Sequence, residues 1–161
     1  MFNNLFKYED DKLFKKNKRN RQWICYNDLK PTKKGYIKIK LNGRLFMLHR
    51  VIYYFHNQEW DIYHSYLDNS IDHINENKTD NRIENLRVVN NSQNSQNKTH
   101  YGGKPVKGFC FCKSNNRWVG YCYVNKKRKS KSFKTETEAL EYRTKMVELH
   151  YTHHPSKRPI E

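Results

Sequence analysis

The chain has 161 residues, of which 35 % are hydrophobic, and this fraction is low for one large core, so two modest modules fit better than a single globule. Lys and Arg number 32 against 16 Asp and Glu, and the formal net charge of +16 makes a polyanion such as nucleic acid the leading partner. Aromatic residues make up 14 %, which excludes a disordered basic tail, and no apolar run approaches the roughly 20 residues that span a bilayer, so we expect a folded, soluble, intracellular protein with no membrane partner.

The first part of the chain predicts a small layer of hairpins followed by a helix. Short strands are expected at Leu13-Phe14 and at residues 23–26, on either side of a basic run. Residues 35–41 alternate in polarity and predict a strand that turns at Asn42-Gly43. Residues 49–55 place apolar side chains at helical spacing, so we expect a helix that packs on those strands.

The next segment, residues 71–97, carries the clearest chemical signal. Asp72 offers a hard oxygen ligand for a divalent cation, and the adjacent His73 offers a nitrogen with an ordinary pKa of about 6.5 that can take a proton from water. The carboxamides of Asn85 and Asn94 follow at fixed intervals. This spacing suits a nuclease with a single metal ion, and the plain alternative is that Asp72 and His73 merely form a turn.

These residues resemble the HNH family of endonucleases, and within it the phage and intron-encoded homing nucleases. The resemblance covers residues 36–97, beginning with an apolar strand that leads into a His-Arg dipeptide. The matching positions are His49-Arg50, Asp72-His73, Asn77, Asn81, Asn85-Leu86-Arg87 and Asn94 or Asn97.

The resemblance implies a ββα-metal module that holds one Mg or Mn ion in each active site. It implies that Asp72 and Asn94 are the metal ligands, that His73 is the general base, and that Asn85 braces the loop so that His73 is aimed at its water. Asn94 stands where many members of the family have His, which favours hard ions over zinc. Asn90 and Asn97 stay open as alternative second ligands, and His49 is expected to be structural.

Beyond this motif, residues 101–106 contain two glycines and a proline and predict a linker. Residues 108–112, 117–124 and 129–133 predict a meander of three strands. A helix should then begin at Thr135, because Glu138 three residues later completes a capping box. Its packing face is expected to consist of Ala139, Tyr142, Met146 and Leu149.

This C-terminal pattern resembles the Apetala-type DNA-binding domain, the ethylene-response-factor fold of three strands and a helix. The resemblance implies a sheet laid in the major groove of DNA. The expected base and phosphate contacts are Arg117, Trp118, Tyr121, Lys113, Lys126, Arg128 and Lys131. Two alternatives stay open: Trp118 and Phe133 as core residues beneath the helix, and the lysines at 126–129 as a solvated turn.

Two compositional features refine this picture. No Asp or Glu occurs from Asn85 through Thr135, while Lys and Arg recur throughout, so this stretch is suited to phosphate. The four cysteines form no C-x-x-C pair, so no structural zinc is expected, and free thiols are favoured over a Cys110–Cys122 disulfide.

We therefore expect an α+β chain with an HNH domain and its hairpin layer in residues 1–100, a linker in 101–106, and a DNA-binding domain with a short tail in 107–161. The predicted function is sequence-selective, divalent-metal-dependent cleavage of double-stranded DNA to 5′-phosphate and 3′-hydroxyl ends, with homing by analogy alone. One active site per chain implies nicking by a monomer or double-strand cleavage by a homodimer. The expected location is the cytoplasm of a bacterial host or the nucleus or cytoplasm of a virus-infected cell. A non-catalytic DNA-binding regulator and an RNA binder are the alternatives.

Overall fold

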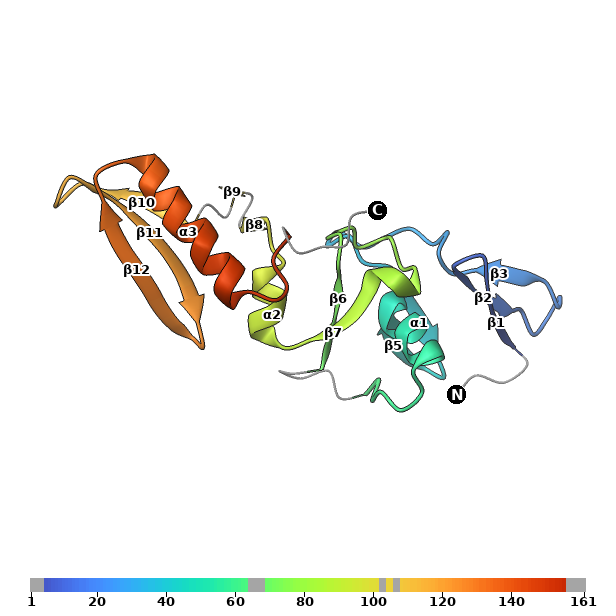
Figure 1. The fold of residues 1–161 in the computed structure, drawn as a ribbon. Coiled ribbons are helices and arrows are strands. Elements are labelled where there is room, and N and C mark those ends of the chain that lie inside the picture. Colours follow the sequence, from blue (N-terminus) through green and yellow to red (C-terminus); the bar gives the residue numbers. More distant parts are fainter. Residues whose placement is uncertain (1–4, 64–68, 102–103, 106–107, 156–161) are drawn as a thin grey trace. The chain divides into compact units, whose positions relative to one another are not determined.

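A computed structural model describes residues 5–63, 69–101, 104–105 and 108–155. It is a mixed structure with several antiparallel sheets and three α-helices in the described residues (Figure 1). The chain divides into two compact units, Met1–Asn90 and Asn91–Glu161, and each is described separately below. No helix in the described residues is both long enough and apolar enough to cross a membrane.

The first unit begins with the sheet β1-β2-β3, formed by Phe6–Glu9, Lys12–Lys16 and Trp23–Cys25. The predicted strand at 13–14 falls within β2, and the one predicted at 23–26 extends one residue beyond β3, whereas β1 was not predicted. A two-residue turn at Asp10 and Asp11, both with positive φ, joins β1 to β2. Leu13 of β2 is fully buried and connects this sheet to the core of the unit.

A second hairpin and a helix complete that core. Strands β4 (Lys38–Leu41) and β5 (Arg44–Met47) pair across the Asn42-Gly43 turn, as the sequence predicts. Helix α1 (Leu48–His56) follows at once and confirms the predicted helix. Its Leu48, Val51 and Ile52 are fully buried, and each contributes roughly 1.5–3 kcal/mol by leaving water.

The segment with the Asp-His pair forms a third hairpin in the same unit. Strand β6 (Ser70–His73) pairs with β7 (Leu86–Val89), and the 3-10 turn η1 (Ile83–Asn85) leads into β7. Ile71 and Leu86 join the core cluster that contains α1. Asp72 and His73 are thus the last two residues of a strand whose inner side chains are anchored in the core.

The second unit opens with helix α2 (Asn91–Gln96) and the short strands β8 (His100–Tyr101) and β9 (Lys104–Pro105). The Gln96 carboxamide oxygen accepts hydrogen bonds from the Thr152 and His153 backbone amides, which ties α2 to the C-terminal part of the chain. The compact units therefore divide before the predicted linker at 101–106, and β8 pairs with β9 within it. Linker residues 102–103 and 106, and the tail at 156–161, lie outside the described residues.

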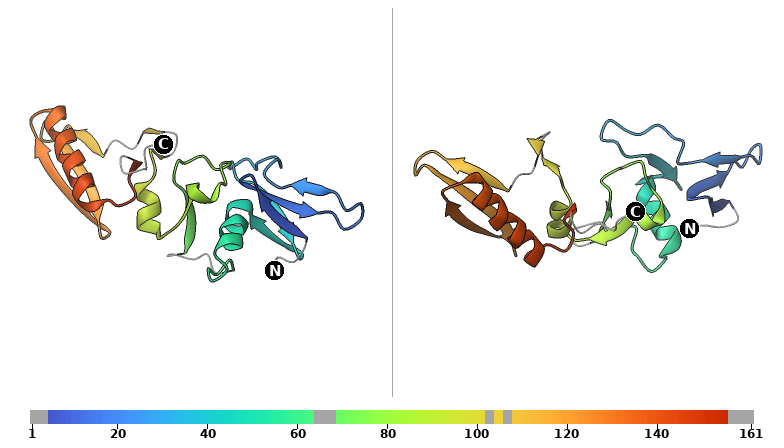
Figure 2. Two further views of the ribbon diagram at one scale, coloured as in Figure 1. Left: turned by 45° about the vertical axis from the view of Figure 1, so that its right-hand side comes forward. Right: turned by 45° about the horizontal axis from the view of Figure 1, so that its top comes forward.

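The rest of the second unit is a three-stranded antiparallel sheet with one helix, the architecture that the sequence predicts. Strands β10 (Phe109–Cys112), β11 (Arg117–Val124) and β12 (Lys127–Phe133) lie in chain order. Helix α3 (Glu136–His150) lies along one face of the sheet in the views of Figure 2. Its backbone comes so close to Gly120 that a Cβ there would lie 2.5 Å from the Ala139 carbonyl oxygen.

The start of α3 is as predicted, and its packing face is so in part, since Ala139 is buried and Met146 packs against the core of the second unit. Thr135 and Glu138 form the capping box. The buried side chains are Ala139, Arg143 and Val147, whereas Leu149, predicted to pack, is 66 % exposed. The prediction was wrong at Leu149 because apolar periodicity alone does not place Arg143 among the buried residues of the helix.

Candidate active site

His73 lies at the end of β6 in a buried, hydrogen-bonded position. Its ring is 4 % exposed, and Nε2 lies 3.1 Å from Oδ1 of Asn81, which is 2 % exposed. The Asn81 amide donates its Nδ2 to the Thr79 carbonyl at 3.1 Å, so its oxygen is the atom that faces His73. An amide oxygen can only accept, and Nε2 therefore carries the proton of the neutral ring, which leaves Nδ1 as the basic nitrogen.

Two further rings surround the His73 imidazole. The His49 ring centroid is 4.9 Å away in an edge-on arrangement, and that of Tyr36 is 6.2 Å away. Tyr36 also contacts His49 at 5.4 Å. This packing restricts how the imidazole can turn, as a group that must be aimed at one substrate atom requires.

Burial keeps both histidines uncharged at neutral pH. It lowers the pKa of His73 from 6.5, against the hydrogen bond that His73 makes to Asn81 and the negative charge of Asp72, both of which raise it. It lowers the pKa of His49 to about 3, and the nearby His73 and Arg50 lower it further. A neutral His73 is in the protonation state that can accept a proton from water.

Asp72 pairs with a cation across the hairpin. Its Oδ2 accepts from Arg87 Nη2 at 3.0 Å and from Nε at 3.2 Å, and the two residues are register partners on β6 and β7. Burial raises the pKa of Tyr36, and the negative charge of Asp72 raises it further. The Asp72 carboxylate therefore acts on the cluster of rings formed by Tyr36, His49 and His73. Asp72 is thus a fixed negative charge next to a buried base.

Asn85 ties together the loop that follows His73. Its Oδ1 accepts from the Asn75 backbone amide at 3.0 Å, and its Nδ2 donates to Asn75 Oδ1 at 2.9 Å and to the Asp80 carbonyl at 2.8 Å. The side chain is 7 % exposed. Because the same loop carries Asn81, Asn85 acts on His73 through the loop rather than by touching the ring.

Residues 46–96 match the model of the HNH endonuclease family. We call this stretch the HNH segment. It contains α1, the β6–β7 hairpin and α2, and with them Asp72, His73, Asn85 and Asn94. The match supports an HNH nuclease. Comparison with curated proteins and with solved structures found no match.

The HNH segment offers few classical metal ligands. No group of three or more His, Cys, Asp and Glu side chains within the described residues is placed to hold a metal ion. A cation beside Asp72 would therefore take its other ligands from amide oxygens, water or substrate phosphate, which is a donor set that Mg accepts. The predicted second ligand, Asn94, lies half-buried on α2 in the second unit. Asn97 is buried and follows the end of α2, and Asn90 is the last residue of the first unit.

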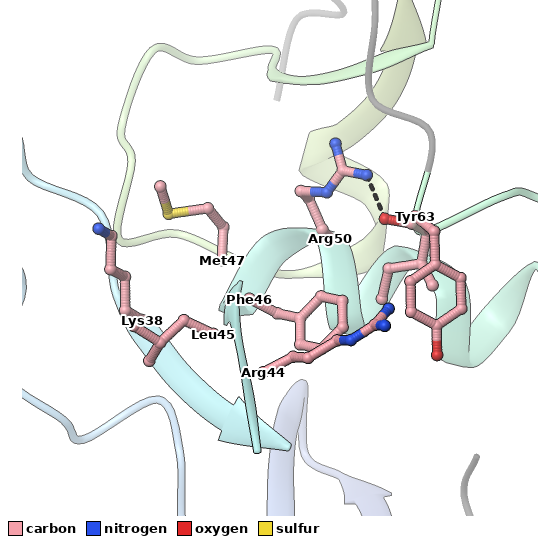
Figure 3. Close-up of a pocket in the computed structure, with 8 residues that line it drawn as sticks. Lys38, Arg44, Leu45, Phe46, Met47, Arg50 and Tyr63 are labelled. Carbon is pink, nitrogen blue, oxygen red and sulfur yellow. Dashed lines mark hydrogen bonds between the residues drawn. The ribbon is translucent and has the colours of Figure 1, made fainter. Parts of the chain in front are cut away.

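The Arg of the His-Arg dipeptide has a separate place in the HNH segment. Arg50 lies over the Trp60 ring. It donates Nη2 to the Ile62 carbonyl at 2.5 Å, the hydrogen bond dashed in Figure 3. It lines a pocket of about 400 Å³ in which no acidic side chain occurs among the lining residues that the structure describes. The pocket also contains Lys38, Arg44, Leu45, Phe46, Met47, Ile62 and Tyr63.

The strand register divides the predicted DNA contacts of the second unit between two faces. Gly120 faces α3, and side chains alternate along a strand, so Trp118 lies on the helix side and Arg117 and Tyr121 lie on the open face. The register partners Arg128 and Lys131 fall on the open and the helix side, respectively. On the open face the Arg128 guanidinium lies 4.4 Å from the Tyr121 ring centre.

The remaining predicted contacts and the core alternatives are also placed. Lys113 and Lys126 are exposed in the turns before and after β11. Phe133 contacts Tyr142 of α3 at 5.4 Å, in agreement with the core alternative for this residue. Trp118 contacts Phe109 and Phe111 on the helix side of the sheet.

Sequence reasoning missed three residues that shape the candidate site. Asn81 was recognised as part of the family pattern, but no function was assigned to it. Its spacing from Asp72 and Asn85 in the sequence could have suggested a function. Tyr36 carries no signal, because it reaches His73 only through the fold. Arg87 could have been paired with Asp72 had the hairpin register been known.

Proposed function

We propose that the chain is a divalent-metal-dependent DNA endonuclease in which His73 is the general base. The observation that carries this is the buried imidazole, held by Asn81 through Nε2 and uncharged, next to the Asp72 carboxylate in a segment that matches HNH endonucleases. A neutral base next to a fixed carboxylate is what hydrolysis of a phosphodiester by activated water requires.

The residues divide the work as follows. His73 takes a proton from the attacking water at Nδ1, while Asn81 holds the Nε2 proton and stabilises the imidazolium that results. Asp72 and Asn94 would hold a Mg or Mn ion, which when bound neutralises charge that develops on the leaving 3′ oxygen. Asn85 holds in place the loop that positions Asn81. The products would be 5′-phosphate and 3′-hydroxyl ends.

The C-terminal sheet and helix would supply DNA recognition as an Apetala-type module. Supporting this, the open face of the sheet presents Arg117, Tyr121 and Arg128 together, and the sheet belongs to a stretch without acidic residues. A two-stranded ribbon fits the major groove of B-DNA. Sequence selectivity, a homing role and cleavage of both strands by a homodimer belong to this same proposal.

The test is plasmid cleavage with Mg, with Mn and with chelator. Replacing His73 with Ala should reduce cleavage by roughly 10²–10⁴-fold, because general acid–base catalysis contributes about that much. Affinity for a duplex in chelator should stay near that of the wild type, because His73 is buried and carries no charge.

His56 offers a matched control, since it is an exposed histidine at the end of α1 in the same unit. His56→Ala should cleave like the wild type. Full activity in His73→Ala would overturn the mechanism. Duplex binding without cleavage by the wild type under any of these metal conditions would instead favour the non-catalytic DNA-binding regulator.

A further inference from the structure

Arg143 occupies an unusual position on the inward face of α3. It is 8 % exposed, and it makes no hydrogen bond or ion pair with any residue in the described part of the chain. Its Nε is buried without a partner. Burial accordingly lowers the pKa of Arg143. Burying a cation without a counter-charge costs folding free energy. We therefore expect Arg143 to have a function that offsets this cost.

The surroundings of Arg143 hold the guanidinium in place without neutralising it. The Tyr151 ring lies 5.2 Å from its centre, and the Tyr151 hydroxyl is itself fixed by accepting from the Tyr123 backbone amide at 3.0 Å. Gly108 passes so close that a Cβ there would lie 2.0 Å from Nε. Only glycine leaves room for the guanidinium at this point.

The guanidinium lines a cavity of about 1130 Å³ within the second unit. None of the described residues that line this cavity is acidic, and Lys98 and Lys126 add two more positive charges. Phe109 and Tyr151 are among its aromatic lining residues, and Ser92 and Ser95 contribute hydroxyl groups. The buried guanidinium offers several hydrogen-bond donors, the two lysines add positive charge, and the aromatic rings are planar. Together these groups suit a phosphate ester that carries a planar base.

We propose that this cavity binds a nucleotide, with Arg143 on the phosphate and the aromatic residues against the base. The cavity is lined by residues of the second unit, among them Ser92 and Ser95 of α2, and nucleotide binding there does not require nuclease activity. The ligand can be a free mononucleotide or one unpaired nucleotide of a nucleic acid strand, since both present the same chemistry. The cavity is large enough for a nucleotide, because pockets of about 300–1,000 Å³ hold ligands of that size.

The experiment measures binding of dAMP, deoxyadenosine and inorganic phosphate to the full chain by calorimetry in the presence of chelator. We expect one dAMP per chain and roughly tenfold or more weaker binding of deoxyadenosine, because the latter lacks the charged group. A single-stranded oligonucleotide that binds more tightly than dAMP identifies the strand as the source, and equal affinity identifies the free nucleotide. Absence of dAMP binding at millimolar concentration overturns the proposal.

The variant Arg143→Met tests the residue itself. It should weaken dAMP binding by roughly tenfold or more, whereas Lys145→Met, which removes an exposed charge from the same helix, should not. Without ligand, Arg143→Met should melt at the same temperature as the wild type or higher, since it removes an unpaired buried charge. A structural role would instead lower the melting temperature.

A second variant keeps the test decisive if Arg143→Met does not fold. Lys126 is exposed in the β11–β12 turn and lines the cavity, so Lys126→Met should fold normally and bind dAMP several-fold more weakly. Unchanged dAMP affinity in both Lys126→Met and any folded Arg143 variant would contradict the assignment of the cavity.

Discussion

At the scale of single residues, the clearest consequence of the fold is the uncharged state of His49. Its pKa of about 3 is far below the 6.5 of an exposed histidine. Between these two pH values the unfolded chain binds a proton that the folded chain does not. His49 therefore reduces stability as the pH falls below 6.5, by about 1.4 kcal/mol per pH unit until the pH nears 3.

Replacing His49 with Phe keeps a ring against Tyr36 and His73 and removes the titrating group. We expect the free energy of unfolding in urea to fall less steeply between pH 6.5 and pH 4 in this variant than in the wild type. The residual slope should reflect His73, whose pKa is lowered as well. Equal slopes in the two proteins would show that His49 is not buried in its neutral form.

Single residues also show what the sequence could and could not reveal. Asp72 and His73 were recognisable because they are adjacent and belong to a spaced motif. The Asn81 contact and the lone Arg143 were not, because each depends on which side chains the fold brings together. Arg143 in particular looked like one more surface cation in a strongly basic chain, and only its place in the inward row of α3 distinguishes it.

At the scale of elements, α3 depends on its first turn. The Thr135 hydroxyl accepts from the Glu138 amide at 3.2 Å, and the Glu138 carboxylate accepts from the Thr135 amide at 3.1 Å. Thr135→Ala should therefore destabilise the second unit by about 1 kcal/mol. Hydrogen exchange should become faster in α3 and β11, while the protection of β6 and β7 stays as in the wild type. Equal loss of protection in both units would contradict the division into two compact units.

Helix α3 also shows why the ends of helices and strands were easier to predict than the faces that they bury. Capping chemistry is local, so Thr135 and Glu138 could be recognised three residues apart. Two-residue turns such as Asn42-Gly43 are local too, and they were predicted correctly. Strand β1 was missed because Phe6–Glu9 is only four residues long and is defined by its pairing with β2. The face of β11 that packs on α3 likewise depends on the close approach of the Ala139 backbone to Gly120, which cannot be predicted from the sequence.

At the scale of the whole molecule, the net charge of +16 predicts DNA binding that weakens steeply with salt. Each phosphate contact adds about 0.9 to the slope of log affinity against log salt for a duplex. Arg117 and Arg128 share the open face of the C-terminal sheet, and both are exposed. Replacing the two with Gln should therefore lower the slope by about 1.8 and weaken binding at every sequence tested.

Lys131 provides the matched control for this measurement, because it is an exposed cation on the same sheet but on the helix side. If DNA lies against the open face, Lys131→Gln should leave the slope close to that of the wild type. Fluorescence anisotropy of a labelled duplex at several salt concentrations, with chelator present to prevent cleavage, measures all three proteins. A slope that falls for Lys131→Gln and not for the double variant would place the DNA on the helix side and remove the open face from the proposed interface.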